Sequence, residues 1–144
     1  MDTQELLARE EIRATLTLYN KGGDAADYGL LASAFHEDGA LVMGDGSIRL
    51  SGRAEISGEL LRRARLRGHG TAGVFQRHNL TTNRIDVLSA NEAAVRTTYL
   101  VVTELGPDHA GEYIDRFEKR ADRWLIAERR ATLDWMRSDS RFCK

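Results

Sequence analysis

The pattern that decides the fold is a pair of segments late in the chain, GEYIDRFEKR at 111–120 and DRWLIAERR at 122–130. Both segments have the aromatic and aliphatic content and the length of a β-strand. Only a short polar turn at Ala121 and Asp122 separates them. Such a turn leaves no room for a crossover, so the two strands are expected to be antiparallel neighbours.

Similar strand patterns precede this pair in the chain. Long strands are expected at 75–88, 92–105, 110–120 and 123–135. The connections at 89–91 and 106–108 contain turn-forming residues, including the only proline, Pro107. Strands of about 12 residues joined by short turns predict an antiparallel meander that is strongly curved.

The first half of the chain is mainly helical. Apolar residues recur at helical spacing from Thr3 to a stop at Gly22 and Gly23, and Asp27 is placed to cap a short second helix. A third helix is expected over about 51–67, after a small hairpin at 40–50. Helices followed by a meander predict an α+β fold with the helices on one concave face of the sheet.

Size and composition exclude several classes of protein. The 144 residues fit a single domain over 1–144, with a core at about 5–135 and a tail at 136–144. A net charge of -1 argues against nucleic-acid binding. No apolar run is long enough for a membrane span, and the acidic N-terminus does not resemble a signal peptide. The single cysteine suits a reducing compartment, so a cytoplasmic location is expected.

Several short motifs, taken in order, resemble the nuclear transport factor 2-like superfamily and its SnoaL-like branch. They are YNKGGD at 19–24, LASAFHEDGA at 31–40, SGRAEI at 51–56, RHNLTTN at 77–83 and YIDRF at 113–117 followed by Trp124. The resemblance implies a cone-shaped barrel, in which a strongly curved, mainly antiparallel sheet and three helices close an apolar pocket. Members include scytalone dehydratase, bile-acid 7α-dehydratase, steroid isomerase and polyketide cyclases, together with domains that have no catalysis, so fold alone does not decide function.

The resemblance also implies candidate catalytic residues. Tyr19 and Asp24 match a phenol or amine and a carboxylate five residues later, and His78 matches the histidine that pairs with that carboxylate. Arg130, six residues after Trp124, matches an arginine of a further member, hexachlorocyclohexane dehydrochlorinase. The strand around 97–99 departs from the pattern, because it has no histidine or aspartate where several dehydratases have one.

Residue chemistry supports a base at His78. A carboxylate that holds one ring nitrogen fixes the tautomer, so the other nitrogen can remove a proton from bound substrate. Tyr19 could then stabilise developing charge or protonate a departing hydroxyl. The structural alternatives are that Asp24 caps a helix, that His78 is satisfied within its strand and that Tyr19 is core.

Two further charged residues are candidates in the last strands. Asp115 shares a strand face with Tyr113 and Phe117, and it either lines the pocket or pairs across strands with an arginine. Arg129 and Arg130 point to opposite faces, and simple alternation places Arg130 with Trp124, Ile126 and Glu128. His36, His69 and His109 fall in predicted turns and are expected at the surface. No spacing predicts a metal site, and no motif predicts a cofactor.

The favoured function is a cofactor-free lyase or isomerase for a small, mostly apolar hydroxylated or keto substrate, with dehydration first. The alternatives are a binding or assembly domain without catalysis, and epoxide hydrolase or cyclase chemistry in the same pocket. The expected pocket walls are Phe35, Met43, Phe75, Leu100, Tyr113 and Trp135. The substrate itself cannot be named, because wall residues vary independently of the scaffold.

Two expectations concern surfaces. A homodimer or homotrimer is expected, because Leu80, Ile85, Val95, Val101 and Ile114 were assigned to an outer sheet face that helices could not cover. The tail at 137–144 carries one apolar anchor, Phe142, and could lie over the pocket mouth. Deleting it is then expected to weaken substrate binding and to leave thermal stability nearly unchanged.

Overall fold

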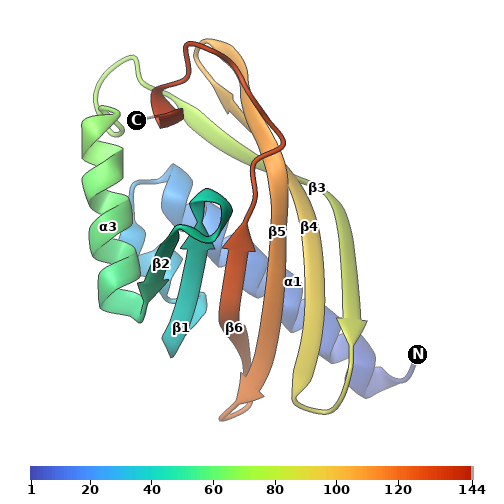
Figure 1. Cartoon of the computed structure of the whole chain (residues 1–144). Coiled ribbons are helices and arrows are strands. Elements are labelled where there is room, and N and C mark those ends of the chain that lie inside the picture. The colour runs from blue at the N-terminus through green and yellow to red at the C-terminus, as the bar shows by residue number, and fades with distance from the viewer. Residues whose placement is uncertain (144) are drawn as a thin grey trace.

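A computed structural model describes residues 1–143 and shows a curved sheet that wraps around one long helix (Figure 1). The helices are α1 (Thr3–Asp24), α2 (Tyr28–Ala32) and α3 (Arg53–Leu66), with short 3-10 turns η1 (Gly44–Gly46) and η2 (Arg141–Cys143). The strands are β1 (Phe35–Met43), β2 (Ile48–Ser51), β3 (Gln76–Val87), β4 (Glu92–Thr103), β5 (Gly106–Arg120), β6 (Arg123–Ala131) and β7 (Trp135–Met136).

The strand order across the sheet is β2-β1-β6-β5-β4-β3, and β7 pairs with the start of β5. β1 and β6 run parallel, and the other pairs are antiparallel. Figure 1 shows α1 crossing the concave side, with α3 beside β2. The sheet is strongly curled but does not close on itself, so the α+β fold is confirmed with an open rather than a sealed barrel.

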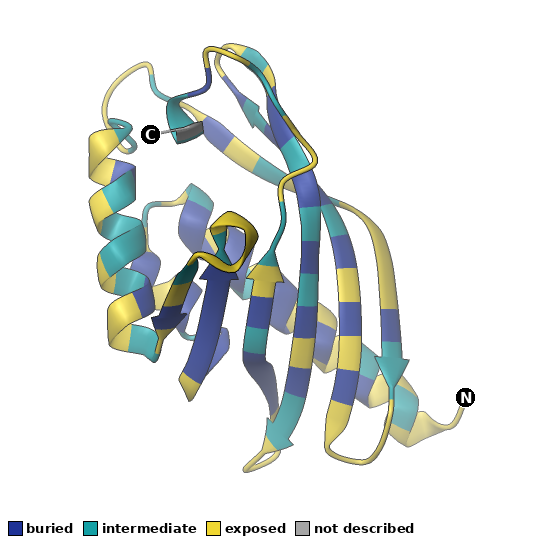
Figure 2. Ribbon diagram, viewed as in Figure 1, coloured by how far each residue is buried: buried dark blue, intermediate teal, exposed yellow. Residues whose placement is uncertain are grey.

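The core lies between the concave face and the helices, and Figure 2 shows buried and exposed positions alternating along the strands. Strand β4 alternates most regularly, with Ala93, Val95, Thr97, Tyr99, Val101 and Thr103 buried. α1 contributes Ile12 and Leu16, both at most 3% exposed. Burial of these side chains supplies the main favourable term in folding.

Three β-bulges decide which side chains face the core. In β5, Val101 pairs with His109 and Val102 with Pro107, which leaves Asp108 as an extra residue. In β6, Ile126 pairs with Phe117 and Glu128 with Arg116, so Ala127 is extra. In β3 the register shifts between Leu80 and Asn83. Each bulge reverses the alternation of the strand beyond it.

The first helix continues past the predicted stop and ends at Asp24. Gly22 is required for close packing rather than for helix termination. A Cβ at Gly22 would lie 2.4 Å from the backbone nitrogen of Leu31, where α2 packs against α1. The extra turn brings the Asp24 carboxylate to the start of β3.

The prediction of an apolar outer sheet face is wrong for four of the five residues assigned to it. Ile85, Val95 and Val101 are at most 3% exposed on the concave side, and Leu80 packs against the same core. Only Ile114 belongs to the convex side, where its register partners are Arg96 and Arg130. In residues 1–143, none of the helices has the length and apolar character needed to cross a bilayer.

Candidate active site

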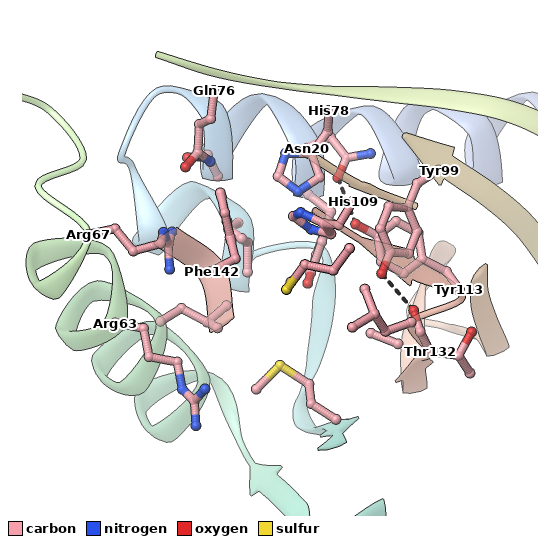
Figure 3. Close-up of a pocket in the computed structure, with 18 of the residues that line it drawn as sticks. Asn20, Arg63, Arg67, Gln76, His78, Tyr99, His109, Tyr113, Thr132 and Phe142 are labelled. Carbon is pink, nitrogen blue, oxygen red and sulfur yellow. Dashed lines mark hydrogen bonds between the residues drawn. The ribbon is translucent and has the colours of Figure 1, made fainter. Parts of the chain in front are cut away.

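A cavity of about 260 Å³ opens between the concave face of the sheet, α1, α3 and the C-terminal segment. This is near the lower limit of ligand pockets, which suits a small molecule. Its polar lining residues come from six parts of the fold, and Figure 3 shows most of them pointing toward one another. They include Asn20, Arg63, Arg67, Gln76, His78, Tyr99, His109, Tyr113 and Thr132.

Asp24 and His78 form a hydrogen-bonded pair at one wall of the cavity, as expected. Nδ1 of His78 lies 2.6 Å from Oδ1 of Asp24, and the backbone N–H of His78 donates to Oδ2 at 2.9 Å. A carboxylate can only accept, so Nδ1 carries the proton and Nε2 keeps its lone pair. His78 lines the cavity, and both side chains are about 15% exposed or less.

A second imidazole lines the same cavity, and no local feature of the sequence indicated it. His109 is 7% exposed, and its Nδ1 lies 2.7 Å from Oδ2 of Asp108, which is itself 1% exposed. The expectation of a surface turn is wrong, because β5 begins at Gly106 and its bulge turns both residues inward. Ser140 donates to the same Oδ2 at 2.6 Å.

Tyrosines and one amide supply hydrogen-bond donors. Burial raises the pKa of Tyr19, against the opposing effect of Arg129, and raises the pKa of Tyr113 well above its ordinary value. Burial also raises the pKa of Tyr99 to about 12. These phenols are therefore neutral near pH 7 and act as donors rather than bases. Asn20, missed at the sequence level, lines the cavity with an Nδ2 that has no partner among the described residues.

Arg130 was assigned to the pocket, and the structure corrects this. The bulge at Ala127 turns Arg130 to the outer face, where it is exposed, and buries Arg129 completely. Arg129 donates to both oxygens of Asp115, at 2.8 and 2.7 Å. Asp115 therefore has the cross-strand arginine partner and does not line the cavity.

The buried ion pair supports the tyrosines from behind. The guanidinium of Arg129 lies 4.2 Å from the ring centroid of Tyr19 and 3.9 Å from that of Tyr113. Burial opposes its charge, but the Asp115 carboxylate outweighs this effect and raises the pKa of Arg129. The ion pair thus holds two pocket rings in place without contacting the cavity.

Two of the six predicted wall residues, Met43 and Tyr113, line the cavity. Phe35 is fully buried behind it, edge-on to Tyr19. Leu100 faces outward because its neighbour Tyr99 faces inward. Phe75 and Trp135 are 42% and 51% exposed, outside the cavity, because the strands begin and end elsewhere than predicted.

The C-terminal segment forms one side of the cavity mouth, as expected for Phe142. This ring lies 4.6 Å from that of His109, and the guanidinium of Arg67 sits 4.1 Å from its centroid. Burial lowers the pKa of Arg67, whose Nε has no hydrogen-bond partner in residues 1–143. Arg63, by contrast, pairs with Glu59. Across residues 1–143, no three His, Cys, Asp or Glu side chains gather as a metal site would require.

Comparison with solved structures supports the fold. The chain superposes on a protein of unknown function from Mycobacterium tuberculosis with 27% identity and a TM-score of 0.73, covering 94% of this chain and 76% of the other. A scytalone dehydratase candidate from Novosphingobium aromaticivorans is 22% identical with a TM-score of 0.79, and the match covers 95% of this chain and 91% of the other. ActVI-ORFA from Streptomyces coelicolor is 21% identical with a TM-score of 0.73, and the match covers 88% of this chain and 96% of the other.

No curated protein matches the sequence significantly. The model of the SnoaL-like domain matches residues 4–130, which is most of the chain. The resemblance inferred from the motifs is thereby confirmed, and it agrees with the curled sheet, the three helices and the central cavity. The chain belongs to the SnoaL-like domain family.

Proposed function

We propose that this protein is a cofactor-free lyase or isomerase that acts by general acid–base catalysis on a small hydroxylated or keto compound, with dehydration as the first choice. The observation that carries the proposal is the Asp24–His78 pair at the wall of a small, mostly apolar cavity. An imidazole whose tautomer is fixed by a carboxylate is a common proton acceptor in enzymes.

In the proposed reaction, Nε2 of His78 removes a proton from a carbon next to a carbonyl group. Asp24 stabilises the imidazolium that results, and its second hydrogen bond to the backbone of His78 keeps it in place. Both contacts are made before substrate arrives, so little reorganisation is needed at the moment of transfer.

The negative charge that develops on the carbonyl oxygen needs a donor. The Nδ2 group of Asn20 is suited to this role because it is buried at the cavity without a partner in the described chain. Its Oδ1 lies 3.5 Å from the hydroxyl of Tyr113, which orients the amide. Tyr19, whose phenol stays protonated, is a second donor.

The cavity lining indicates the substrate class. Tyr19, Tyr99 and Tyr113 place three aromatic rings around the space, and Tyr99 and Tyr113 stack at 4.5 Å. These surfaces favour a ring compound of one or two rings that carries a carbonyl and a hydroxyl group. The scytalone dehydratase candidate among the structural neighbours supports this class through the shared fold only.

The proposal can be tested with cyclic β-hydroxy ketones. Purified protein is incubated with 3-hydroxycyclohexanone and with 3-hydroxy-1-tetralone, and the unsaturated product is followed by absorbance. His78→Gln and Asp24→Asn should each lower turnover by about 10²–10⁴-fold. Asp86→Asn is the matched control, because Asp86 pairs with Arg84 at the surface of β3.

Two results would contradict the assignment. Turnover that survives His78→Gln would place the base elsewhere. Tight binding of these ketones without any turnover would instead support the binding-domain alternative for the same cavity.

A further inference from the structure

His109 and His78 occupy equivalent places on either side of Val101. Val101 pairs with His78 on β3 and with His109 on β5, and residues directly opposite one another share a sheet face. Their backbones are therefore two strand spacings apart, roughly 10 Å. Figure 3 shows both imidazoles among the residues around the cavity.

Each imidazole is oriented in the same manner. Nδ1 of His78 contacts Asp24 at 2.6 Å, and Nδ1 of His109 contacts Asp108 at 2.7 Å. Because each carboxylate takes the Nδ1 side, each Nε2 remains for the cavity that both rings line. The cavity thus contains two proton-transfer atoms, whereas the reaction proposed above uses only one.

The formal charges around the cavity balance when one of the two imidazoles is an imidazolium and the other is neutral. Asp24 and Asp108 contribute two carboxylates, and Arg67 contributes one guanidinium. The charge of Arg63 is balanced by Glu59. Among the described residues around the cavity, a single imidazolium would complete the balance. Two imidazolium groups would repel each other and leave an excess of positive charge.

We propose that His109, oriented by Asp108, is the general acid that complements the base His78. This inference rests on the proposed dehydration. Nε2 of His78 takes the proton from the α-carbon, the C–H electrons form the new double bond, and the C–O bond breaks. The departing hydroxyl receives the Nε2 proton of the His109 imidazolium and leaves as water. His78 then loses its proton to solvent and His109 regains one.

The surroundings of His109 make its imidazolium a better proton donor than an ordinary imidazolium. Burial lowers the pKa of His109, Asp108 opposes this effect, and the charges of His78 and Arg67 lower the pKa further. Tyr99 from β4 and Phe142 from the C-terminal segment pack on the ring and carry no charge.

A purely structural role for His109 is the competing explanation, because its ring also anchors Phe142. The first experiment therefore measures protonation in the free protein. Long-range ¹H–¹⁵N NMR follows both rings during a pH titration of the wild type, His78→Gln and His36→Gln. His36 is a matched control, buried at 6% and bonded to the carbonyl of Glu118 outside the cavity.

Removal of His78 should raise the pKa of His109 by about one unit, as for strongly interacting sites. The His36 variant should leave the pKa of His109 unchanged. An unaltered His109 titration in His78→Gln would overturn the acid–base couple. Protonation of Nε2 and retention of the Nδ1 proton at the low end of the titration would identify the expected imidazolium.

The second experiment separates the two proton transfers. In D₂O, 3-hydroxycyclohexanone reports exchange at the α-carbon and elimination of water at the same time. His109→Gln should slow elimination by about 10²–10⁴-fold while exchange continues, whereas His78→Gln should stop both. Equal loss of exchange and elimination in His109→Gln, or no loss of either, would overturn the role of His109.

The failure of the broader proposal has a different signature. If the wild type neither exchanges nor dehydrates the ketones, the proposed function fails, and the acid role of His109 fails with it. If the wild type is active, His78→Gln is inactive and His109→Gln behaves like the wild type, the dehydration stands and this inference alone is wrong.

Discussion

Arg129 is the most deeply constrained side chain of the molecule. It has no exposed surface, binds Asp115 through two hydrogen bonds and lies between the rings of Tyr19 and Tyr113. A fully buried pair contributes little net stability by itself, but removal of one partner leaves an uncompensated charge. The rings on either side couple this ion pair to the shape of the cavity.

The first prediction concerns this pair. Arg129→Met should lower the free energy of unfolding by about 3–5 kcal/mol, because Asp115 remains buried without its cation. Urea denaturation gives the value. The double variant Arg129→Met with Asp115→Leu should recover much of the loss, since it removes both charges. Losses that simply add would show that the two residues are not coupled.

How much of the site could be predicted depended on the bulges. Tyr19, Asp24 and His78 precede the first irregularity of β3, and the motif resemblance located them correctly in sequence and in space. Arg129 and His109 each follow a bulge by one or two residues, at Ala127 and Asp108. Alternation counted through an extra residue assigns every later side chain to the wrong face. A bulge is settled by packing of the whole sheet, so the sequence around Arg129 and His109 offered no local signal for it.

At the scale of elements, the C-terminal segment is better anchored than its polar sequence suggested. The backbone N–H of Arg137 donates to the carbonyl of Asp108 at 2.8 Å, and its side chain donates to that of Leu105 at 2.6 Å. Ser140 is 2% exposed and bonds Asp108. The segment therefore fastens the start of β5, where His109 is held.

These contacts change what deletion of residues 137–144 should do. We expect a loss of at least about 2 kcal/mol of unfolding free energy, because the deletion removes the packed ring of Phe142 and a hydrogen bond to Asp108. This replaces the expectation of unchanged stability. Substrate binding should weaken as well. Thermal unfolding and ligand titration measure the two effects, with the exposed Ser138→Ala as control, and an unaltered melting temperature would contradict the docked arrangement.

Element boundaries also explain which wall residues could be predicted. Met43 and Tyr113 lie within segments that were predicted as strands and are strands in the structure. Phe75 lies just before β3, and Trp135 belongs to a two-residue strand that pairs with β5 beyond the end of β6. Strand ends depend on long-range pairing, so the sequence placed the strands well and their ends less well.

At the scale of the whole molecule, the fold responds to pH through His109. Burial lowers the pKa of His109, so between that value and about 6.5 the unfolded chain binds a proton that the folded chain does not. Stability should therefore fall as the pH decreases through this window. The contribution is at most about 1.4 kcal/mol per pH unit. Denaturation of wild type and His109→Gln at several pH values measures it, and the variant should be less dependent on pH.

Two glutamates with lowered pKa values, Glu59 and Glu104, act in a more acidic window than His109. The pKa values of Glu59 and Glu104 are about 2, held there by hydrogen bonds from arginines. Their contribution is complete above about 4.5 and is lost only as the pH falls toward 2. Equal slopes for wild type and His109→Gln between pH 5 and 6.5 would show that folding does not lower the pKa of His109.

The fourth prediction is self-association. The apolar surface that supports it differs from the one predicted from the sequence. Ala110 pairs with Leu100 on one side and with Trp135 on the other, which forms an apolar row on the outer face. Trp135 is 51% exposed in this chain. We expect a homodimer or homotrimer that covers this row, and Trp135→Glu should dissociate it in sedimentation experiments at micromolar concentration. Leu88→Glu, at an exposed turn, is the control, and a monomeric wild type would rule the assembly out.

The register shift in β3 has a consequence for the behaviour of the protein in crowded solution. β3 is the longer of the two edge strands of the sheet, and a long straight edge would invite pairing with another chain. Between Leu80 and Asn83 its ladder is interrupted, and hydrogen bonds among Thr81, Thr82 and Thr98 replace it. Arg77 and Arg84 add charge on either side. We therefore expect this edge to be a poor template for pairing with a second chain, which would limit aggregation at the open side of the sheet.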